Sequence, residues 1–283
     1  MKILARAHDV TVGDAKTLAG KVKQSGYDGV QLVLYKGIEG LGGAWAGTVS
    51  DEYLKEIADA FKAEGLTVGM LGAYFNPVHS NKELVEKCIN RFKDHLRFAH
   101  MFDCSYVGSE TGSYNDDKWT YHPMNRSEVA YRENVRIWSD ILAHAKAVGS
   151  NVALEGAYGH CMHNPQALYR LYNEINNGNL FITVDIFNYL HPGDFSKEFQ
   201  HVLVDDSLKL FGDNIKVYHL KDFIYDEANK KLIQVGLGEG LMDLEYIVKS
   251  AMKHTPNAVL VFEGCPKDKI ESSIKYIKSI LGE

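Results

Sequence analysis

The sequence predicts an α/β protein that folds as one (β/α)₈ TIM barrel, a single domain over residues 1–283. Short apolar runs of strand length alternate along the chain with longer segments of helical periodicity, and there are eight of each. Such alternation is typical of a parallel sheet covered by helices. No tract rich in proline, glycine or serine interrupts it, so we expect no linker. Eight units in a chain of this length favour a closed barrel, which typically has about 250 residues.

The main alternative is an open, doubly wound sheet. Its dinucleotide-binding form has a G-x-G-x-x-G loop after the first strand. That loop is absent from the first strand–helix turn of this chain, so the barrel is preferred.

The first half of the chain contains four of the predicted units. Their strands are apolar runs at Ile3–Ala7, Gly29–Leu34, Thr67–Leu71 and Tyr106–Gly108. In the segment after each strand, apolar residues recur every three or four positions, as on one face of a helix. These helical segments are Ala15–Val22, Tyr53–Lys62, Leu84–Leu96 and Ser127–Val148. Gly65 is expected to cap the second of these helices.

The second half repeats the same unit four times. Its strands are expected at Val152–Leu154, Leu180–Val184, Ile215–Tyr218 and Ala258–Phe262, and three of these runs are rich in β-branched residues. The helices are expected at Pro165–Ile175, Lys197–Phe211, Leu244–Lys253 and Lys267–Ile280. The chain is therefore covered by strand–helix units almost from end to end.

The overall composition is that of an ordinary globular protein, with 45% hydrophobic and 24% charged residues and a net charge of −6. A nucleic-acid partner is disfavoured, because the longest basic cluster is Lys230-Lys231. The four cysteines have no paired spacing, which suggests reduced thiols. The first residues contain only a short apolar patch, and no run is long enough to span a membrane. We therefore expect a cytoplasmic protein without a membrane partner, and we leave open whether it is a homo-oligomer.

The last four predicted strands end in residues whose side chains can bind a metal ion or transfer a proton. The runs V-A-L-E, F-I-T-V-D, K-V-Y-H and V-L-V-F-E end at Glu155, Asp185, His219 and Glu263, which are 30, 34 and 44 positions apart. In a barrel, the carboxyl ends of the strands form the active-site face. One acid at a strand end is often only a helix cap. Four such residues, one barrel unit apart, predict a shared site.

Binding of one divalent metal ion would explain why these four residues lie together. Three neighbouring carboxylates repel each other and raise each other's pKa unless a cation lies between them. One imidazole with carboxylate oxygens suits Mn²⁺, Co²⁺, Zn²⁺ or Fe²⁺, and Mg²⁺ less well because of the nitrogen ligand. A structural zinc site would contain cysteine, and this set has none.

At these residues the chain resembles the xylose isomerase-like TIM barrels. That family includes sugar and sugar-phosphate isomerases and epimerases, ketose 3-epimerases, hydroxypyruvate isomerase, inosose dehydratase and endonuclease IV. The resemblance extends over nearly the whole chain. It rests on the four strand ends, on H-L-K-D from His219 to Asp222, on the turn Gly236-Leu-Gly-Glu-Gly240 followed by Asp243, and on Asn76-Pro77.

The resemblance implies a metal-dependent sugar isomerase or epimerase. It implies that Glu155, Asp185, His219 and Glu263 all bind one metal, and that Glu155 and Glu263 also transfer protons. Removing a proton next to a carbonyl leaves an enediolate, whose negative charge a metal can stabilise. Epimerisation needs one carboxylate to take the proton and another to return one from the opposite face. The substrate would be a small carbohydrate.

Two candidate substrate-binding residues depart from the family pattern. Many of the sugar epimerases have a histidine three residues after the sixth-strand aspartate, where this chain has Asn188. Asparagine can hydrogen-bond a hydroxyl but cannot exchange a proton usefully at pH 7. Some ketose epimerases have an arginine shortly after the seventh-strand histidine. Lys221 stands there in this chain, and it either contacts a substrate oxygen or pairs with Asp222.

Further candidates for the substrate pocket follow the earlier strands. Glu110 either binds a substrate hydroxyl or caps nearby amides, and His8 either lines the mouth or is structural. Tyr74 can form a wall against the sugar. Trp45 and Trp119 lie in loops where an aromatic side chain can cover a substrate, although packing is the simpler role for both.

Three other functions remain open. An inosose-dehydratase-like lyase, acting on a cyclic polyol ketone, begins with the same proton abstraction, and H-L-K-D fits that branch slightly better than the ketose epimerases. A non-catalytic sugar-binding barrel would retain the same site. An abasic-site endonuclease is disfavoured, because that chemistry needs three metals, more histidines at strand ends and a basic groove.

Overall fold

Eight parallel strands close into a barrel in the computed structural model, which describes residues 1–42 and 47–283. The order around the barrel is β1-β10-β7-β6-β5-β4-β3-β2, so the first and last barrel strands are hydrogen-bonded neighbours. The barrel strands are β1 (Ile3–Arg6), β2 (Gly29–Leu32), β3 (Thr67–Gly72), β4 (Tyr106–Glu110), β5 (Asn151–Glu155), β6 (Leu180–Asp185), β7 (Ile215–Leu220) and β10 (Val259–Phe262). The predicted TIM barrel is therefore confirmed.

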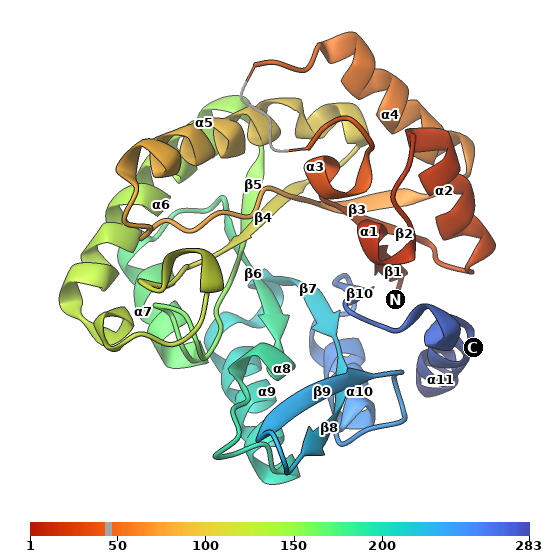
Figure 1. Cartoon of the computed structure of the whole chain (residues 1–283), viewed down its shortest axis with the longest axis vertical. Coiled ribbons are helices and arrows are strands. Elements are labelled where there is room, and N and C mark those ends of the chain that lie inside the picture. The colour runs from red at the N-terminus through yellow and green to blue at the C-terminus, as the bar shows by residue number, and fades with distance from the viewer. Residues whose placement is uncertain (43–46) are drawn as a thin grey trace.

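A ring of helices surrounds these strands, one after each (Figure 1). The helices are α2 (Ala15–Gln24), α4 (Asp51–Ala63), α5 (Lys82–Phe98), α6 (Glu128–Val148), α7 (Pro165–Ile175), α9 (Lys197–Phe211), α10 (Leu244–His254) and α11 (Ile270–Leu281). All of them except α11 begin after a residue whose side chain caps the helix: Ser127, for example, accepts a hydrogen bond from the Ala130 amide at the start of α6. Gly65, expected as a cap, follows α4 with a φ of +67°.

Several short elements were not predicted. The antiparallel hairpin β8 (Asp222–Asp226) and β9 (Lys231–Val235), light blue in Figure 1, lies outside the barrel sheet. Short helices closely follow three strands, namely α1 (Ala7–Val10), α3 (Leu34–Gly37) and α8 (Ile186–Tyr189). The remaining 3₁₀ turns are η1 (Ala99–Phe102), η2 (Asp116–Lys118), η3 (Pro123–Arg126), η4 (Gly212–Asn214) and η5 (Lys267–Lys269). Segments of three to five residues are too short to show a hydrophobic period.

Apolar side chains fill the interior of the barrel. Leu4, Met70, Ala153, Val217 and Val261 form a buried cluster separate from the larger core between strands and helices. Gly108 leaves room for this packing, because a Cβ atom there would lie 2.5 Å from Met70 Sδ. The barrel is therefore a packed core rather than a pore, and a ligand must bind at one end of it.

The described helices include none that combines the length and the apolar character needed to cross a membrane.

Candidate metal centre

The four residues predicted to bind a metal come together at the carboxyl ends of four neighbouring strands. Glu155 and Asp185 are the last residues of β5 and β6, His219 is the penultimate residue of β7, and Glu263 directly follows β10. Asp185 and His219 are register partners across β6 and β7. The side chains of Glu155, Asp185 and His219 are almost fully buried.

The three carboxylates converge on one ring nitrogen of His219. Its Nδ1 atom lies 3.1 Å from Glu155 Oε2, 3.7 Å from Asp185 Oδ2 and 2.9 Å from Glu263 Oε2. Ligand atoms of Glu155, Asp185 and His219 all lie within 4.8 Å of one another, close enough to hold one ion. Glu263 contacts the same nitrogen but is outside that three-residue group.

The buried groups of this cluster fit a divalent cation. His219 Nδ1 is buried among three carboxylates, and the buried Asp185 Oδ2 lies 3.7 Å from it and 2.7 Å from Lys221 Nζ. Carboxylates gathered so closely repel one another, and a cation held among their oxygens and this nitrogen relieves that repulsion. The donor set of one imidazole nitrogen and carboxylate oxygens suits a transition metal.

Without a metal ion, the negative charges of the carboxylates are balanced by the protonated side chains of His219 and Lys221. Burial lowers the pKa of His219, but the carboxylates of Glu155 and Glu263 outweigh it and raise the pKa to about 10. Burial raises the pKa of Asp185 to about 6, against the opposing charge of Lys221. Burial also tends to raise the pKa of Glu263, yet Lys221 and His219 hold it well below its usual range. Without a metal ion, the protonated imidazole of His219 therefore supplies positive charge that a bound metal ion would supply instead.

Gln31 in β2 orients the imidazole, and our sequence reasoning did not include it. Its Oε1 lies 2.6 Å from His219 Nε2, and its Nε2 donates to the Tyr74 hydroxyl over 2.9 Å. An oxygen acceptor requires a proton on Nε2, which leaves Nδ1 available to a metal. The signal in the sequence was a single polar residue inside the apolar run Gly29–Leu34.

Replacing Gln31 with leucine should therefore lower metal affinity by about 10- to 100-fold, the usual cost of losing such a partner. The Gln31→Glu variant keeps an oxygen acceptor for His219 Nε2 and should retain most of the affinity. Isothermal titration of both metal-free variants with Zn²⁺ measures the difference. Equal affinity for the leucine variant and the wild type would contradict this role.

Lys221 faces the candidate site and does not pair with Asp222. Its Nζ atom lies 2.7 Å from Asp185 Oδ2 and 3.4 Å from Glu263 Oε2, and it donates to Asn188 Oδ1 over 2.9 Å. Successive side chains of an extended strand point to opposite faces, so His219 and Lys221 share one face and Asp222 takes the other. The expected alternative of a Lys221–Asp222 pair is therefore wrong.

Asp222 instead organises the glycine-rich turn that follows β9. Its buried carboxylate accepts hydrogen bonds from the backbone amides of Phe223, Gly238, Gly240 and Met242, all at 2.8–2.9 Å. A Cβ atom on Gly240 would lie 2.3 Å from Asp222 Oδ1, which explains the glycine. The last residue of the H-L-K-D motif thus has a structural role.

The Asp222→Ala variant should lose about 3 kcal/mol or more of its free energy of unfolding, because four backbone amides, two of them in buried hydrogen bonds, lose a charged acceptor. Urea denaturation monitored by circular dichroism measures this loss. Asp226 is the matched control, since its carboxylate also accepts hydrogen bonds from backbone amides, those of Ala228 and Asn229, but at a half-buried position in exposed hydrogen bonds. An equally small effect of both alanine substitutions would contradict the structural role of Asp222.

The predicted substrate residues lie around the cluster. Asn188 links two members of the site, because its Nδ2 donates to Glu155 Oε1 over 2.6 Å while its Oδ1 accepts from Lys221. Both polar atoms of Asn188 are thus already engaged. Asn76, from the Asn-Pro pair, is structural: it donates to the carbonyl oxygens of Ser113 and Asp116 and so fixes the loop after β4.

A cavity of about 340 Å³ opens beside Glu263 at the same end of the barrel. Its lining includes three predicted residues, His8, Tyr74 and Glu110, together with Trp119. The other lining residues are Arg6, Val33, Tyr35, Lys36 and Glu263. Trp45 lies outside the described residues. The structure therefore places three of the five candidate substrate residues in one cavity, with Asn188 and Lys221 in the neighbouring ion-pair network.

Glu110 has an unusual environment in this cavity. Among the described residues its carboxyl group has no hydrogen-bond or ion-pair partner. Burial, with the nearby charges of Glu155 and Glu263, raises the pKa of Glu110 well above its usual value. The amide-capping alternative for Glu110 therefore finds no support. Burial and Arg6 lower the pKa of His8 to about 4, so that imidazole is neutral at pH 7.

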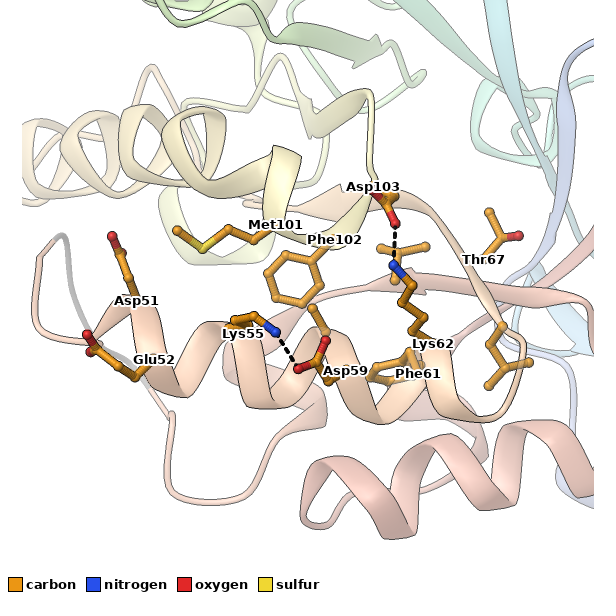
Figure 2. Close-up of a pocket in the computed structure, with 13 residues that line it drawn as sticks. Asp51, Glu52, Lys55, Asp59, Phe61, Lys62, Thr67, Met101, Phe102 and Asp103 are labelled. Carbon is orange, nitrogen blue, oxygen red and sulfur yellow. Dashed lines mark hydrogen bonds and ion pairs between the residues drawn. The ribbon is translucent and has the colours of Figure 1, made fainter.

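A larger cavity, of about 530 Å³, lies elsewhere (Figure 2). It lies between α4 and η1, and includes Thr67 and Val68 at the start of β3, away from the strand ends that carry the cluster. Its lysines are paired with acids, Lys55 with Asp59 and Lys62 with Asp103, as the dashed lines in Figure 2 show. Its charged groups are thus paired with each other, and because it lies away from the cluster we do not assign it to the candidate site.

The fold and the cluster together define a parallel (β/α)₈ barrel with a candidate metal centre at the carboxyl ends of its strands. The chain belongs to the xylose isomerase-like TIM barrel family, whose model matches residues 19–280. The resemblance seen in the sequence is therefore confirmed. No curated protein matches the chain.

Solved structures of low sequence identity share the fold over the full chain. An IOLI protein with a bound zinc atom has a TM-score of 0.74 at 17% identity, with 100% of this chain and 98% of that chain covered. The probable 3-DHS dehydratase AsbF from Bacillus anthracis has a TM-score of 0.73 at 17% identity, with 98% and 99% covered. A D-psicose 3-epimerase crystallised with D-fructose has a TM-score of 0.71 at 14% identity, with 100% of both chains covered.

Proposed function

We propose that this protein is a divalent-metal-dependent isomerase or epimerase that acts on a sugar or sugar phosphate. The observation that supports this most is the convergence of Glu155, Asp185 and Glu263 on His219 Nδ1. The cluster lies beside a cavity lined by both polar and aromatic side chains, as carbohydrate recognition requires. The epimerase among the similar structures is consistent with this class of reaction.

The metal would be held by Glu155, Asp185, His219 and Glu263. When bound, it would polarise a substrate carbonyl and stabilise the negative charge that develops on proton removal. The nitrogen ligand favours Mn²⁺, Co²⁺, Zn²⁺ or Fe²⁺ over Mg²⁺. The zinc atom in the IOLI structure agrees with an ion of this kind.

Glu155 and Glu263 are the proposed proton-transfer pair. They come from the fifth and eighth barrel strands, which are three strands apart in the closed sheet. Two carboxylates separated in this way can approach a substrate from different sides, as epimerisation demands. Glu263 also lines the cavity itself, so it is placed to reach a bound sugar.

The remaining residues would bind and orient the substrate. Glu110 offers a sugar hydroxyl a carboxyl group that has no hydrogen-bond or ion-pair partner among the described residues, and His8 offers a neutral imidazole. The ring of Tyr74 is one wall of the cavity, and its hydroxyl is fixed by Gln31. Lys221 would reach a substrate oxygen from the ion-pair network around Asp185, and Asn188 would do so through the second hydrogen of its Nδ2.

A second candidate function is a lyase of the inosose-dehydratase kind. The H-L-K-D sequence and the dehydratase among the similar structures favour it. Both functions begin with the same proton abstraction, so the same residues would act in each. They differ in whether a hydroxyl group is then expelled.

Incubation of the metal-loaded protein with keto sugars, their phosphates and cyclic polyol ketones in D₂O separates these functions. An isomerase or epimerase incorporates solvent deuterium next to the carbonyl and yields an isomeric product, whereas a lyase yields a product that has lost water. Proton NMR and mass spectrometry distinguish the two. Sugar binding without deuterium incorporation or product would instead identify a non-catalytic sugar-binding barrel.

A further inference from the structure

Arg6 ends β1 and belongs to the candidate site, although the sequence reasoning did not include it. Its guanidinium donates two hydrogen bonds to one carboxylate, from Nε to Asp9 Oδ2 over 2.8 Å and from Nη2 to Asp9 Oδ1 over 2.9 Å. The remaining nitrogen, Nη1, donates to Glu263 Oε1. Arg6 therefore connects an acid on its own side of the barrel to a candidate metal ligand.

Asp9 is itself held in place by the opposite end of the chain. Its Oδ2 accepts a hydrogen bond from the backbone amide of Gly264 over 2.8 Å. Gly264 directly follows Glu263 and has a φ of +70°, in the region that favours glycine. The result is a closed ring of contacts through Arg6, Asp9, Gly264 and Glu263 that joins the first and last barrel strands.

This ring determines which way the Glu263 carboxylate points. One oxygen, Oε1, is bound to Arg6, and the other, Oε2, lies 2.9 Å from His219 Nδ1. Glu263 lies just beyond β10, where the backbone turns away from the sheet. Its side chain also lines the open cavity, so without Arg6 it would be free to rotate away from the cluster.

Arg6 is suited to positioning rather than to proton transfer. A guanidinium stays protonated at all physiological pH values and presents a rigid fork of donors. Its fork is divided between two carboxylates, so it fixes the angle between them. Among the described residues at this cluster, Lys221 also contacts Glu263, but at 3.4 Å and only through Oε2.

We propose that Arg6 is a positioning residue that orients Glu263 so that its second oxygen completes the metal site. This inference rests on the proposed metal-dependent function. Because Glu263 is outside the tight three-residue group, its participation depends on how its side chain is held. Outer partners of metal ligands typically contribute 10- to 100-fold to metal affinity.

A double-mutant cycle on the full-length, metal-free protein tests this proposal. Co²⁺ affinity is measured by chelator competition for the wild type, Arg6→Ala, Glu263→Gln and the double variant. We expect Arg6→Ala to weaken Co²⁺ binding by about 10- to 100-fold. The same substitution should change the affinity by less than about threefold in the Glu263→Gln background, because the group that Arg6 orients is already altered. The visible spectrum of bound Co²⁺ should change alike in all three variants.

The matched control is Arg97→Ala. Arg97 also connects two carboxylates, Asp94 at 2.9 Å and Asp51 at 3.0 Å, but on the exposed outside of the barrel. Its substitution should leave Co²⁺ affinity unchanged. If Arg6→Ala does not fold, Arg6→Lys and Asp9→Asn are measured in its place. Each weakens the contacts among Arg6, Asp9 and Glu263 but keeps Glu263 itself. Each should therefore weaken Co²⁺ binding, though less than Arg6→Ala would.

Unchanged Co²⁺ affinity in the Arg6 and Asp9 variants would overturn the proposal, as would an equal loss in the wild-type and Glu263→Gln backgrounds. A wild-type protein that binds no Co²⁺ would overturn it together with the proposed function. A protein that binds Co²⁺ but converts no sugar would remove the proposed function alone, because the affinity cycle does not depend on turnover.

Discussion

The Glu263→Gln variant should turn over its substrate about 10²- to 10⁴-fold more slowly than the wild type, the contribution usual for a general acid or base. Glutamine keeps the shape of the side chain and an oxygen that can accept from Arg6. It cannot take up or return a proton. Initial rates measured at saturating metal separate this loss from any weaker metal binding, and circular dichroism checks that the fold is intact.

The control for this prediction is Glu239→Gln. Glu239 lies in the G-L-G-E-G turn and pairs with Lys269 on the surface, at a distance of 2.8 Å. Its substitution removes a carboxylate near the same end of the chain without touching the cluster, so the rate should be unchanged. If the Glu263→Gln variant turns over substrate at a rate within about twofold of the wild type, Glu263 is not a member of the proton-transfer pair.

Removing the metal should reduce the rate by about 10³-fold or more, because the stabilisation of the developing negative charge is worth several kcal/mol. Adding back Mn²⁺, Co²⁺ or Zn²⁺ should restore activity in the wild type but not in His219→Ala. His201→Ala is the control, since that histidine pairs with Asp243 outside the cluster at 3.0 Å. Full activity after exhaustive chelation would contradict a metal-dependent mechanism.

Metal binding should also depend on pH in a defined direction. The pKa of His219 is raised to about 10 in the metal-free protein, so at pH 7 its imidazole is protonated and must lose a proton to bind a metal. Metal affinity should therefore fall as the pH falls below about 10, by about tenfold per pH unit for one released proton. Titration calorimetry in buffers of different ionisation enthalpy counts that proton. Binding without proton release would contradict the protonated state of His219.

The strand ends of the second half of the chain could be read directly from the sequence. Each apolar run there stops at Glu155, Asp185, His219 or Glu263, and the carboxyl ends of parallel barrel strands must lie on one face. Their convergence needs no information about particular contacts. Hydrophobic periodicity is local, so it also predicted the eight long helices and their order.

The contacts that orient these groups could not be predicted in the same way. His219 meets Gln31 across 188 positions of the chain, and Arg6 meets Glu263 across 257. Both pairs depend on which strands become neighbours or face each other when the barrel closes, and no local pattern records this. The cavity beside Glu263 likewise gathers residues from the ends of the first four barrel strands and the last, and from the segments that follow them.

The segment V-Y-H-L-K-D, from Val217 to Asp222, illustrates the difference between what the sequence and the tertiary structure determine. Its apolar residues and its histidine identified a strand that ends at a polar site, which local pattern and barrel topology suffice to establish. The partners of Lys221 and Asp222 were decided only by folding. Alternation along the extended chain sends Lys221 toward Asp185 and the candidate metal centre, while Asp222 turns to the amides of the glycine-rich turn. The direction of each side chain follows from the pleat of the backbone. The partner that it meets, Asp185 for Lys221 and the amides of Gly238 and Gly240 for Asp222, comes from a more distant part of the chain.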